Sequence, residues 1–355
     1  MIVDPQRPEI LEAVVAPPEL SITDAIAQLD MAGTGGLVLC RPDQQVAGLL
    51  TDGDIRRAVL HKVSLTDPCG SIATPDPVVA RAPIEPAEAL QLMLEHDINH
   101  LPVVDETGVL VDFLLRKNLV ADVPGVMSAV VMAGGFGKRL LPLTENVPKP
   151  MLPVGERPLL ERTIDQLRGA GISEVHLTTH YLPDSIVGHF GDGEAFGVHI
   201  SYAAEDEPMG TAGGLRLVPR PNGPFLVING DILTRVSYQD MLRFHQKHGA
   251  TLTVGIRAHE VEVPFGVVEC DDVRVMDLTE KPRIRLLVNA GIYLLEPLAW
   301  DHIPAGRRFD MTDLIRRLLD EGQVVVAFPI IEYWQDVGRH EDYRQANEDL
   351  RDGRF

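Results

Sequence analysis

Apolar positions in the second half of the chain follow two alternating patterns, short apolar runs and longer segments with helical spacing. The runs predict strands at 129–133, 174–179 and 225–228, and the helical spacing predicts helices at 157–169 and 340–351. Strands that alternate with helices are typical of a mixed, mostly parallel sheet with helices on both faces, which binds ligands at the carboxyl ends of its strands. We therefore expect a Rossmann-like α/β domain in this half.

The first half contains a weak internal repeat within residues 20–120, with an offset of 64 residues. Each copy has the pattern of a helix, two short strands and a second helix. Ser21 can cap the first helix of one copy, and Glu85-Pro86 is a start signal in the other. We expect two copies of one small α+β module. Their first helices are expected to bury Ala25, Ile26 and Leu29 in one copy and Ala89, Leu90, Met93 and Leu94 in the other.

A short turn-rich segment, Ala121-Asp122-Val123-Pro124-Gly125, separates the two halves. The chain is therefore predicted to have two domains, residues 1–122 and residues 127–355.

The 355 residues include 52 acidic and 32 basic side chains, which gives a net charge of −20. This charge opposes binding to nucleic acid or anionic lipid, so anionic ligands must be held by local cations. No apolar run approaches the roughly 20 residues of a membrane span, and the first residues do not resemble a secretion signal. We expect a cytoplasmic protein without a membrane or nucleic-acid partner. Its three cysteines, with no Cys-x-x-Cys pair, indicate neither a disulfide framework nor a zinc site.

A glycine-rich loop follows the strand predicted at 129–133. Such a loop can turn sharply and bring its N–H groups close to phosphate oxygens. A Walker A loop is excluded because Met132 and Arg139 stand where its first glycine and its Ser or Thr belong, and Leu140 replaces the third small residue of a dinucleotide fingerprint. The loop therefore predicts a site for a nucleoside triphosphate. Its glycines are Gly134, Gly135 and Gly137, and the cations that follow are Lys138, Arg139 and Lys149.

Taken with the strings that follow it, this loop resembles the signature of the sugar-1-phosphate nucleotidylyltransferases. The strings occur in the family's order, and the resemblance covers roughly residues 127–350. The family usually has Thr where this chain has Lys138. The resemblance implies a nucleotide-diphospho-sugar transferase fold and transfer of a nucleoside monophosphate from a triphosphate to a sugar-1-phosphate. The matching strings are Gly134-Gly135-Phe136-Gly137-Lys138-Arg139, Pro148-Lys149-Pro150, Glu207-Pro208-Met209-Gly210-Thr211, Asn229-Gly230-Asp231, Pro264-Phe265-Gly266, Glu280-Lys281-Pro282, Asn289-Ala290-Gly291 and Trp334-Gln335-Asp336.

The resemblance also implies roles for individual residues. Arg139 would hold the triphosphate together with the glycine loop, and Lys149 would reach its phosphates as a point charge. Lys281 would bind the phosphate of the attacking sugar. The expected nucleotide-binding positions are Ala133, Gly134, Gly135, Gly137, Lys138, Glu207, Gly210 and Thr211, and the expected sugar-binding positions are Gly266, Glu280 and Asn289.

Two aspartates are the candidates for a magnesium site. The approach of two anionic substrates needs a divalent cation, and Mg²⁺ prefers one or two carboxylates together with phosphate oxygens and waters. Asp231 follows the apolar strand at 225–228, and Asp336 follows Tyr333-Trp334. We expect both to bind the metal, with Asp231 also counted among the catalytic residues.

The repeat in the first half resembles a tandem pair of cystathionine-β-synthase (CBS) domains, which commonly bind adenosine nucleotides. By this resemblance Thr51 would contact a phosphate and Asp54 the ribose of AMP or ATP. The second copy has Leu115 and Asn118 at the matching positions, so at most one full nucleotide site is predicted. A pair that serves only to form a homo-oligomer is the alternative.

The combination of the two modules resembles enzymes that make GDP-activated hexoses or hexosamines, so GTP is the favoured donor, in the synthesis of surface glycans. Three alternatives remain open. They are uridylyl or cytidylyl transfer, a different phosphate acceptor such as phosphocholine, and a protein that senses nucleotides without turnover.

Overall fold

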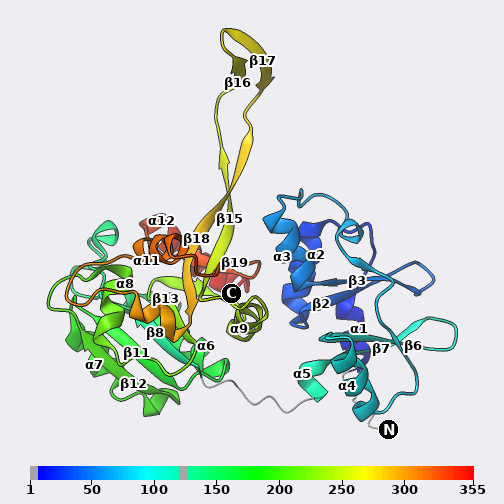
Figure 1. The fold of residues 1–355 in the computed structure, drawn as a ribbon, viewed down its shortest axis with the longest axis horizontal. Helices are drawn as coiled ribbons and strands as arrows, with labels where there is room; N and C mark the ends of the chain where they lie inside the picture. Colours follow the sequence, from blue (N-terminus) through cyan, green and yellow to red (C-terminus); the bar gives the residue numbers. More distant parts are fainter. Residues whose placement is uncertain (1–6, 120–126) are drawn as a thin grey trace. The chain divides into compact units, whose positions relative to one another are not determined.

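The computed structural model describes residues 7–119 and 127–355. The chain forms two compact units, Met1–Val123 and Pro124–Phe355 (Figure 1). The segment predicted to separate the two halves, Ala121 to Gly125, lies outside the described residues.

The first unit contains the two expected copies. In each, a helix precedes two antiparallel strands and a second helix, as predicted. Ser21 caps the first helix through the N–H of Asp24, also as predicted. The elements are α1 (Arg7–Val14), β1 (Val15–Ala16), α2 (Ile22–Ala32), β2 (Gly36–Cys40), β3 (Val46–Thr51), α3 (Asp52–Leu60), β4 (Thr74–Pro75), β5 (Ala80–Arg81), α4 (Pro86–Glu95), β6 (His100–Val104), β7 (Leu110–Leu115) and α5 (Arg116–Leu119).

Apolar side chains from both copies form a shared core in this unit. Phe113 and Leu115 of the second copy pack with Val38 and Leu49 of the first. Among the predicted core residues of α4, Ala89 and Met93 are buried, but Leu94 is 54% exposed. The prediction for Leu94 was wrong because the buried stripe of this short helix is narrower than the run of apolar residues.

The second unit is built on a seven-stranded sheet with the strand order β12-β11-β8-β13-β18-β15-β19. Among the described strands of this sheet, β18 runs antiparallel to its two neighbours, and all other neighbouring strands are parallel. The elements are β8 (Ser128–Met132), β9 (Pro153–Val154), β10 (Arg157–Pro158), α6 (Leu159–Gly169), β11 (Glu174–Thr179), α7 (Pro183–Phe190), β12 (His199–Ala204), α8 (Gly210–Gly213), β13 (Phe225–Asn229), β14 (Ile232–Thr234), α9 (Tyr238–Lys247), β15 (Leu252–Glu262), β16 (Val267–Asp271), β17 (Arg274–Thr279), β18 (Arg283–Leu295), α10 (Pro297–Asp301), α11 (Met311–Asp320), β19 (Val325–Pro329), β20 (Trp334–Asp336) and α12 (His340–Arg351).

Helices cover both faces of this sheet, which confirms the predicted fold class. Alternate residues of a strand point to opposite faces, so Ala129 and Val131 pack with α6, α7 and α9, whereas Val130 packs with α8, α10 and α11. The predicted helix 157–169 begins two residues late, at Leu159, because Arg157 and Pro158 pair with β9 as a short strand.

A two-stranded arm projects from the sheet (Figure 1). The pairing of β15 with β18 continues past the neighbouring strands as far as Glu262 opposite Arg283, and β16 pairs with β17 beyond that point. We call residues 256–290 the arm. Apolar and polar residues alternate along the strands of the arm, but this pattern alone does not show that the strands extend beyond the sheet.

A capping box begins α3 in the first unit. The hydroxyl of Thr51 accepts from the N–H of Asp54 at 3.4 Å, and the Asp54 carboxylate accepts from the N–H of Thr51 at 2.8 Å. Asp54 is 5% exposed and also pairs with Arg57. These contacts satisfy N–H groups that have no partner inside the helix.

Replacing Thr51 with Ala should lower the unfolding free energy of the first unit by about 1 kcal/mol, because the cap is lost. The measurement is urea unfolding followed by far-UV circular dichroism. Both tryptophans, Trp300 and Trp334, belong to the second unit, so their fluorescence transition should not move. Thr66→Ala, at an exposed hydroxyl, is the matched control. Identical dichroism curves for Thr51→Ala and the parent would contradict this prediction.

Candidate functional site

The carboxyl ends of four parallel strands meet at one edge of the sheet in the second unit. Met132 at the end of β8 lies beside Asn229 at the end of β13, and β11 and β12 end together at Thr179 and Ala204. This is the edge at which open α/β sheets bind ligands. The side chains that follow these ends within two residues include His180, Glu205 and Asp231.

Asp231, Asp336 and Lys149 form one cluster at this edge. β14 and β20 pair antiparallel, and the N–H of Val337 donates to the carbonyl of Asp231 at 2.9 Å, which sets the two aspartates side by side. A short turn, Lys149–Met151, brings in the lysine. Its Nζ lies 2.5 Å from Asp231 Oδ2 and 4.0 Å from Asp336 Oδ1. Three predicted site residues are thus brought together from three distant parts of the chain.

The electrostatics of this cluster suit a divalent cation. Burial and the negative charge of Asp231 raise the pKa of Asp336 to about 6, although Lys149 opposes this shift. Oδ1 of Asp231 is buried and has no hydrogen-bond partner among the described residues, and the same holds for Oδ1 of Asn229. A hard cation would relieve both the repulsion and the unsatisfied oxygen.

A cation at this place would have few protein ligands. In the part of the chain that the structure describes, no three His, Cys, Asp or Glu side chains gather as a metal site. Asp231 and Asp336 would therefore hold it as a pair. Two carboxylates completed by phosphate oxygens and waters are the ligands that Mg²⁺ prefers, so the residues present fit this ion.

The glycine loop lies against this cluster. Gly137 has a φ of +61°, and a Cβ there would come within 3.0 Å of the Cβ of Lys149, so both its conformation and its position require glycine. The Thr144 hydroxyl donates to its carbonyl at 2.9 Å. A Cβ on Gly135 would meet no described atom within 4 Å, which leaves that side open to a ligand. Arg139 is exposed, and its charge lowers the pKa of Asp336.

The segment with the predicted nucleotide-binding residues Glu207, Gly210 and Thr211 is held against the start of α11. Gly210 has a φ of +80°, and a side chain there would meet Asp310. The N–H of Thr211 donates to Asp310 Oδ1 at 3.1 Å, and its hydroxyl accepts from the N–H of Met311 at 2.8 Å. These contacts explain why a glycine and a threonine occupy positions 210 and 211, and they involve no ligand. Glu207, by contrast, is exposed to solvent.

The predicted sugar-binding residues are not all brought to this edge. Asn289 lies near it, because the next glycine, Gly291, approaches the Asn229 side chain so closely that a Cβ would be 2.6 Å from Nδ2. Gly266, Glu280 and Lys281 lie together far out on the arm. Eight residues separate Lys281 from Asn289, which corresponds to roughly 25 Å along a strand.

Sequence reasoning missed Glu205 and His180 as members of this edge. Oε2 of Glu205 accepts from the N–H of Met209 at 3.0 Å, and its other oxygen approaches Gly134. His180 bonds to the carbonyl of Glu205 at 2.7 Å and packs against the ring of Phe136. The signal was present for His180, which directly follows the strand predicted at 174–179, as Asp231 follows the strand predicted at 225–228. The strand before Glu205, β12, was not predicted.

In the first unit, Thr51 and Asp54 lie together, but each binds the other. One carboxylate oxygen of Asp54 accepts from Thr51, and the other pairs with Arg57 at 2.5 Å. A ribose hydroxyl would have to displace Arg57. The structure therefore gives this motif a helix-capping role, and its nucleotide role stays a prediction.

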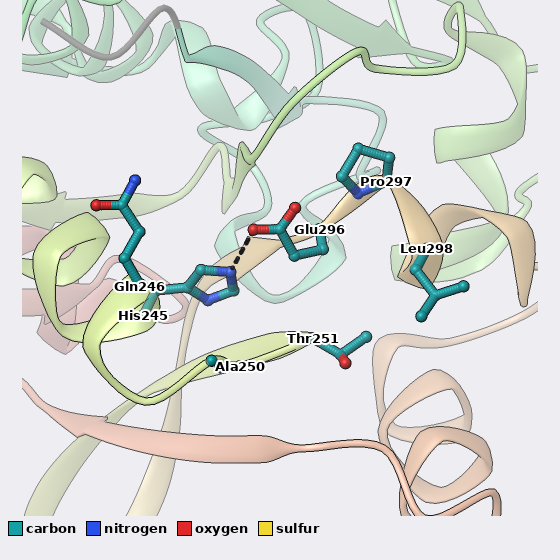
Figure 2. A pocket seen from close by; sticks show the side chains of 8 residues that line it. His245, Gln246, Ala250, Thr251, Glu296, Pro297 and Leu298 are labelled. Atoms are coloured by element: carbon teal, nitrogen blue, oxygen red, sulfur yellow. Dashed lines mark hydrogen bonds and ion pairs between the residues drawn. The ribbon is translucent and has the colours of Figure 1, made fainter.

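A cavity of about 500 Å³ lies at the opposite edge of the sheet (Figure 2). Glu296 lines it and directly follows Leu295, which pairs with Phe225 at the start of β13. His245 is buried there, 3.2 Å from Glu296, and burial lowers its pKa. This cavity contains none of the predicted site residues.

Relatives with known names match somewhat more than three fifths of the chain. A mannose-1-phosphate guanylyltransferase of Mycobacterium tuberculosis is 35% identical over 63% of this chain and 64% of its own length. A UTP–glucose-1-phosphate uridylyltransferase of Synechocystis is 32% identical over 62% of each chain. The crystal structure of HddC from Yersinia pseudotuberculosis has a TM-score of 0.50 and 26% identity over 63% of this chain and all of that one. The match therefore spans less than two thirds of the length of the guanylyltransferase and of the uridylyltransferase.

Among the described residues, no helix is both long and apolar enough to cross a bilayer.

Family comparisons assign both halves of the chain. The CBS domain family matches residues 9–61 and 69–125. The nucleotidyl transferase family matches residues 128–353, which carry the whole sheet and the Asp231 cluster. The chain is a member of the nucleotidyl transferase family with a tandem CBS pair before its transferase unit.

Proposed function

We propose that this protein transfers a nucleoside monophosphate from a nucleoside triphosphate to a sugar-1-phosphate. An oxygen of the sugar phosphate attacks the α-phosphorus of the triphosphate and forms the new P–O bond. The bond from that phosphorus to the β-phosphate oxygen breaks, and pyrophosphate leaves with the electron pair. The products are an NDP-sugar and pyrophosphate.

The observation that carries this proposal is the cluster of Lys149, Asp231 and Asp336 against the glycine loop. Phosphoryl and nucleotidyl transfer need mainly positioning and neutralisation of charge. A lysine between two carboxylates, next to an open glycine backbone, supplies donors for phosphate oxygens and ligands for a cation in one place. The two carboxylates would hold Mg²⁺, which supplies positive charge where the two anionic substrates meet.

The remaining residues have roles that follow from charge and exposure. Arg139 and Lys138 are exposed beside the loop and would bind the β- and γ-phosphates. Glu207 is exposed and would accept from donors on the base, which favours guanine. Lys281 would bind the phosphate of the sugar, and Gly266, Glu280 and Asn289 would contact its hydroxyls, which requires the arm to approach the sheet edge at which Asn289 lies.

GTP is the proposed donor, and the product would serve the synthesis of surface glycans. The named guanylyltransferase relative supports this choice, and the uridylyltransferase relative supports UTP as the second candidate. We further propose that the CBS pair binds an adenosine nucleotide that alters turnover. The motif residues Thr51 and Asp54 occur in the first copy, where they form the capping box of α3.

Pyrophosphate release with GTP, UTP, CTP, dTTP and ATP, each with Mg²⁺ and a pool of hexose- and hexosamine-1-phosphates, should be strong with GTP alone. AMP should change that rate. Turnover only with UTP or CTP would contradict the choice of GTP. If no sugar phosphate supported pyrophosphate release and phosphocholine did, the proposal that the acceptor is a sugar phosphate would be wrong. If the folded protein bound nucleotide but released no pyrophosphate under any of these conditions, the proposal that it is an enzyme would be wrong.

Asp231→Asn should lower metal-dependent turnover by about 100-fold or more, because it removes one of two charged ligands and leaves Lys149 without its closest partner. The amide is isosteric, so tryptophan fluorescence should show an unchanged unfolding transition. Asp320→Asn, at an exposed aspartate of α11, is the matched control and should keep full activity. Parental activity in Asp231→Asn would remove this residue from the site.

Turnover should fall as the pH drops through about 6, because the protonated Asp336 no longer attracts a cation. The midpoint should move to lower pH as Mg²⁺ is raised, since the ion competes with the proton. Asp342 raises the pKa of Asp336, so Asp342→Asn should also move the midpoint to lower pH. The measurement is the pH profile of pyrophosphate release at two Mg²⁺ concentrations. A midpoint that rises in Asp342→Asn would contradict the assignment.

A further inference from the structure

The segment that follows the glycine loop folds back on it as a small closed turn. The Thr144 hydroxyl donates to the Gly137 carbonyl at 2.9 Å. The N–H groups of Leu143 and Glu145 each donate to the carbonyl three residues earlier, at 2.9 and 3.1 Å. We call residues 137–145 the return segment. These bonds close its backbone, but they do not by themselves connect it to the two aspartates of the site.

Two side chains from distant parts of the chain hold the return segment from outside. The hydroxyl of Tyr181, two residues after β11, donates to the Glu145 carbonyl at 2.9 Å. Nε2 of His340 lies 2.9 Å from the carbonyl oxygen of Leu141, although 199 positions separate the two residues in the sequence. A carbonyl oxygen can only accept, so Nε2 donates its hydrogen in this bond.

His340 belongs to the same packed unit as one of the two aspartates. It is the first residue of α12 and lies four positions after Asp336. Val337, between them, is 1% exposed and packs with Leu233 of β14 and Ala346 of α12. The strand end that carries Asp336 and the helix start that carries His340 therefore move together, and the bond to Leu141 connects both to the glycine loop.

Two other contacts fix α12 in its place. The Tyr343 hydroxyl donates to the carbonyl of Pro153 at 2.6 Å, and Oδ1 of Asn347 accepts from the N–H of Gly155 at 2.9 Å. Neither contact involves the return segment. The helix is therefore held without the bond from His340, and removing that bond would release the return segment rather than the helix.

We propose that His340 is a positioning residue, which holds the return segment, and with it the glycine loop, at a fixed place beside Asp231 and Asp336. The inference rests on the proposed function, in which a triphosphate lies on the loop while its phosphates meet a cation held by the two aspartates. A loop that is already in place does not have to be ordered when the triphosphate binds. His340 acts through the loop and not on the substrate.

Loss of this bond should weaken binding of the triphosphate rather than slow the chemistry. If the loop is correctly placed in only a fraction of the molecules, the apparent Kd rises by the inverse of that fraction. One hydrogen bond corresponds to about a five- to tenfold change in such an equilibrium. The bound ground state and the transition state use the same loop position, so kcat should change by less than about twofold. His340 is exposed, so its variants should fold like the parent.

Three variants test this inference. His340→Ala should raise the KM for the triphosphate that the parent uses, by about five- to tenfold. His340→Gln should stay close to the parent, because the Gln amide can donate to the Leu141 carbonyl. Tyr343→Phe, which removes a similar bond of the same helix outside the return segment, is the matched control and should keep the parental KM. A parental KM in His340→Ala, or the same raised KM in the Ala and Gln variants, would overturn the inference.

A second measurement does not depend on turnover. Amide hydrogen exchange of the full chain without nucleotide reports how often the bonded N–H groups of Leu143 and Glu145 open. Both should exchange about fivefold faster in His340→Ala and at the parental rate in Tyr343→Phe. Equal exchange in His340→Ala and the parent would overturn the inference even if the parent were inactive. A parent that releases no pyrophosphate, with faster exchange in His340→Ala, would instead reject only the proposed function.

Discussion

The antiparallel pairing of β14 with β20 is the contact on which the candidate site depends. It joins segments about a hundred residues apart and sets Asp336 beside Asp231, and the bond from Val337 to the Asp231 carbonyl fixes the spacing. Two carboxylates in a half-buried place repel each other, so this pairing costs free energy that Lys149 offsets only in part. An arrangement of charges that is unfavourable without a cation is typical of a site that binds one.

Much of this edge could be predicted from the sequence, because a simple rule applies to it. Polar residues that directly follow apolar strands gather at the carboxyl edge of a parallel sheet, which placed Asp231 and the glycine loop correctly near each other. Asp336 follows no such pattern. It belongs to a three-residue strand that pairs outside the main sheet, and only the resemblance to the family indicated it.

Two other predictions show where residue type alone is insufficient. A Thr three residues before an Asp is suited to bind a nucleotide, but the same pair forms a capping box, and Thr51 and Asp54 are engaged in that box. Thr211 likewise caps α11 through its hydroxyl. Short polar side chains at the start of a helix form hydrogen bonds to its free backbone N–H groups. The sequence does not show whether such a side chain can still bind a ligand.

The arm could not be predicted because it arises from strand length rather than from strand pattern. β15 and β18 are 11 and 13 residues long, whereas β8 and β13 between the helices have five, so the central ladder must continue past the sheet edge. β18 runs against its neighbours, and this sends the extension out at the edge that carries Asp231. An extended ribbon has two unpaired edges, which proteins normally cover or charge.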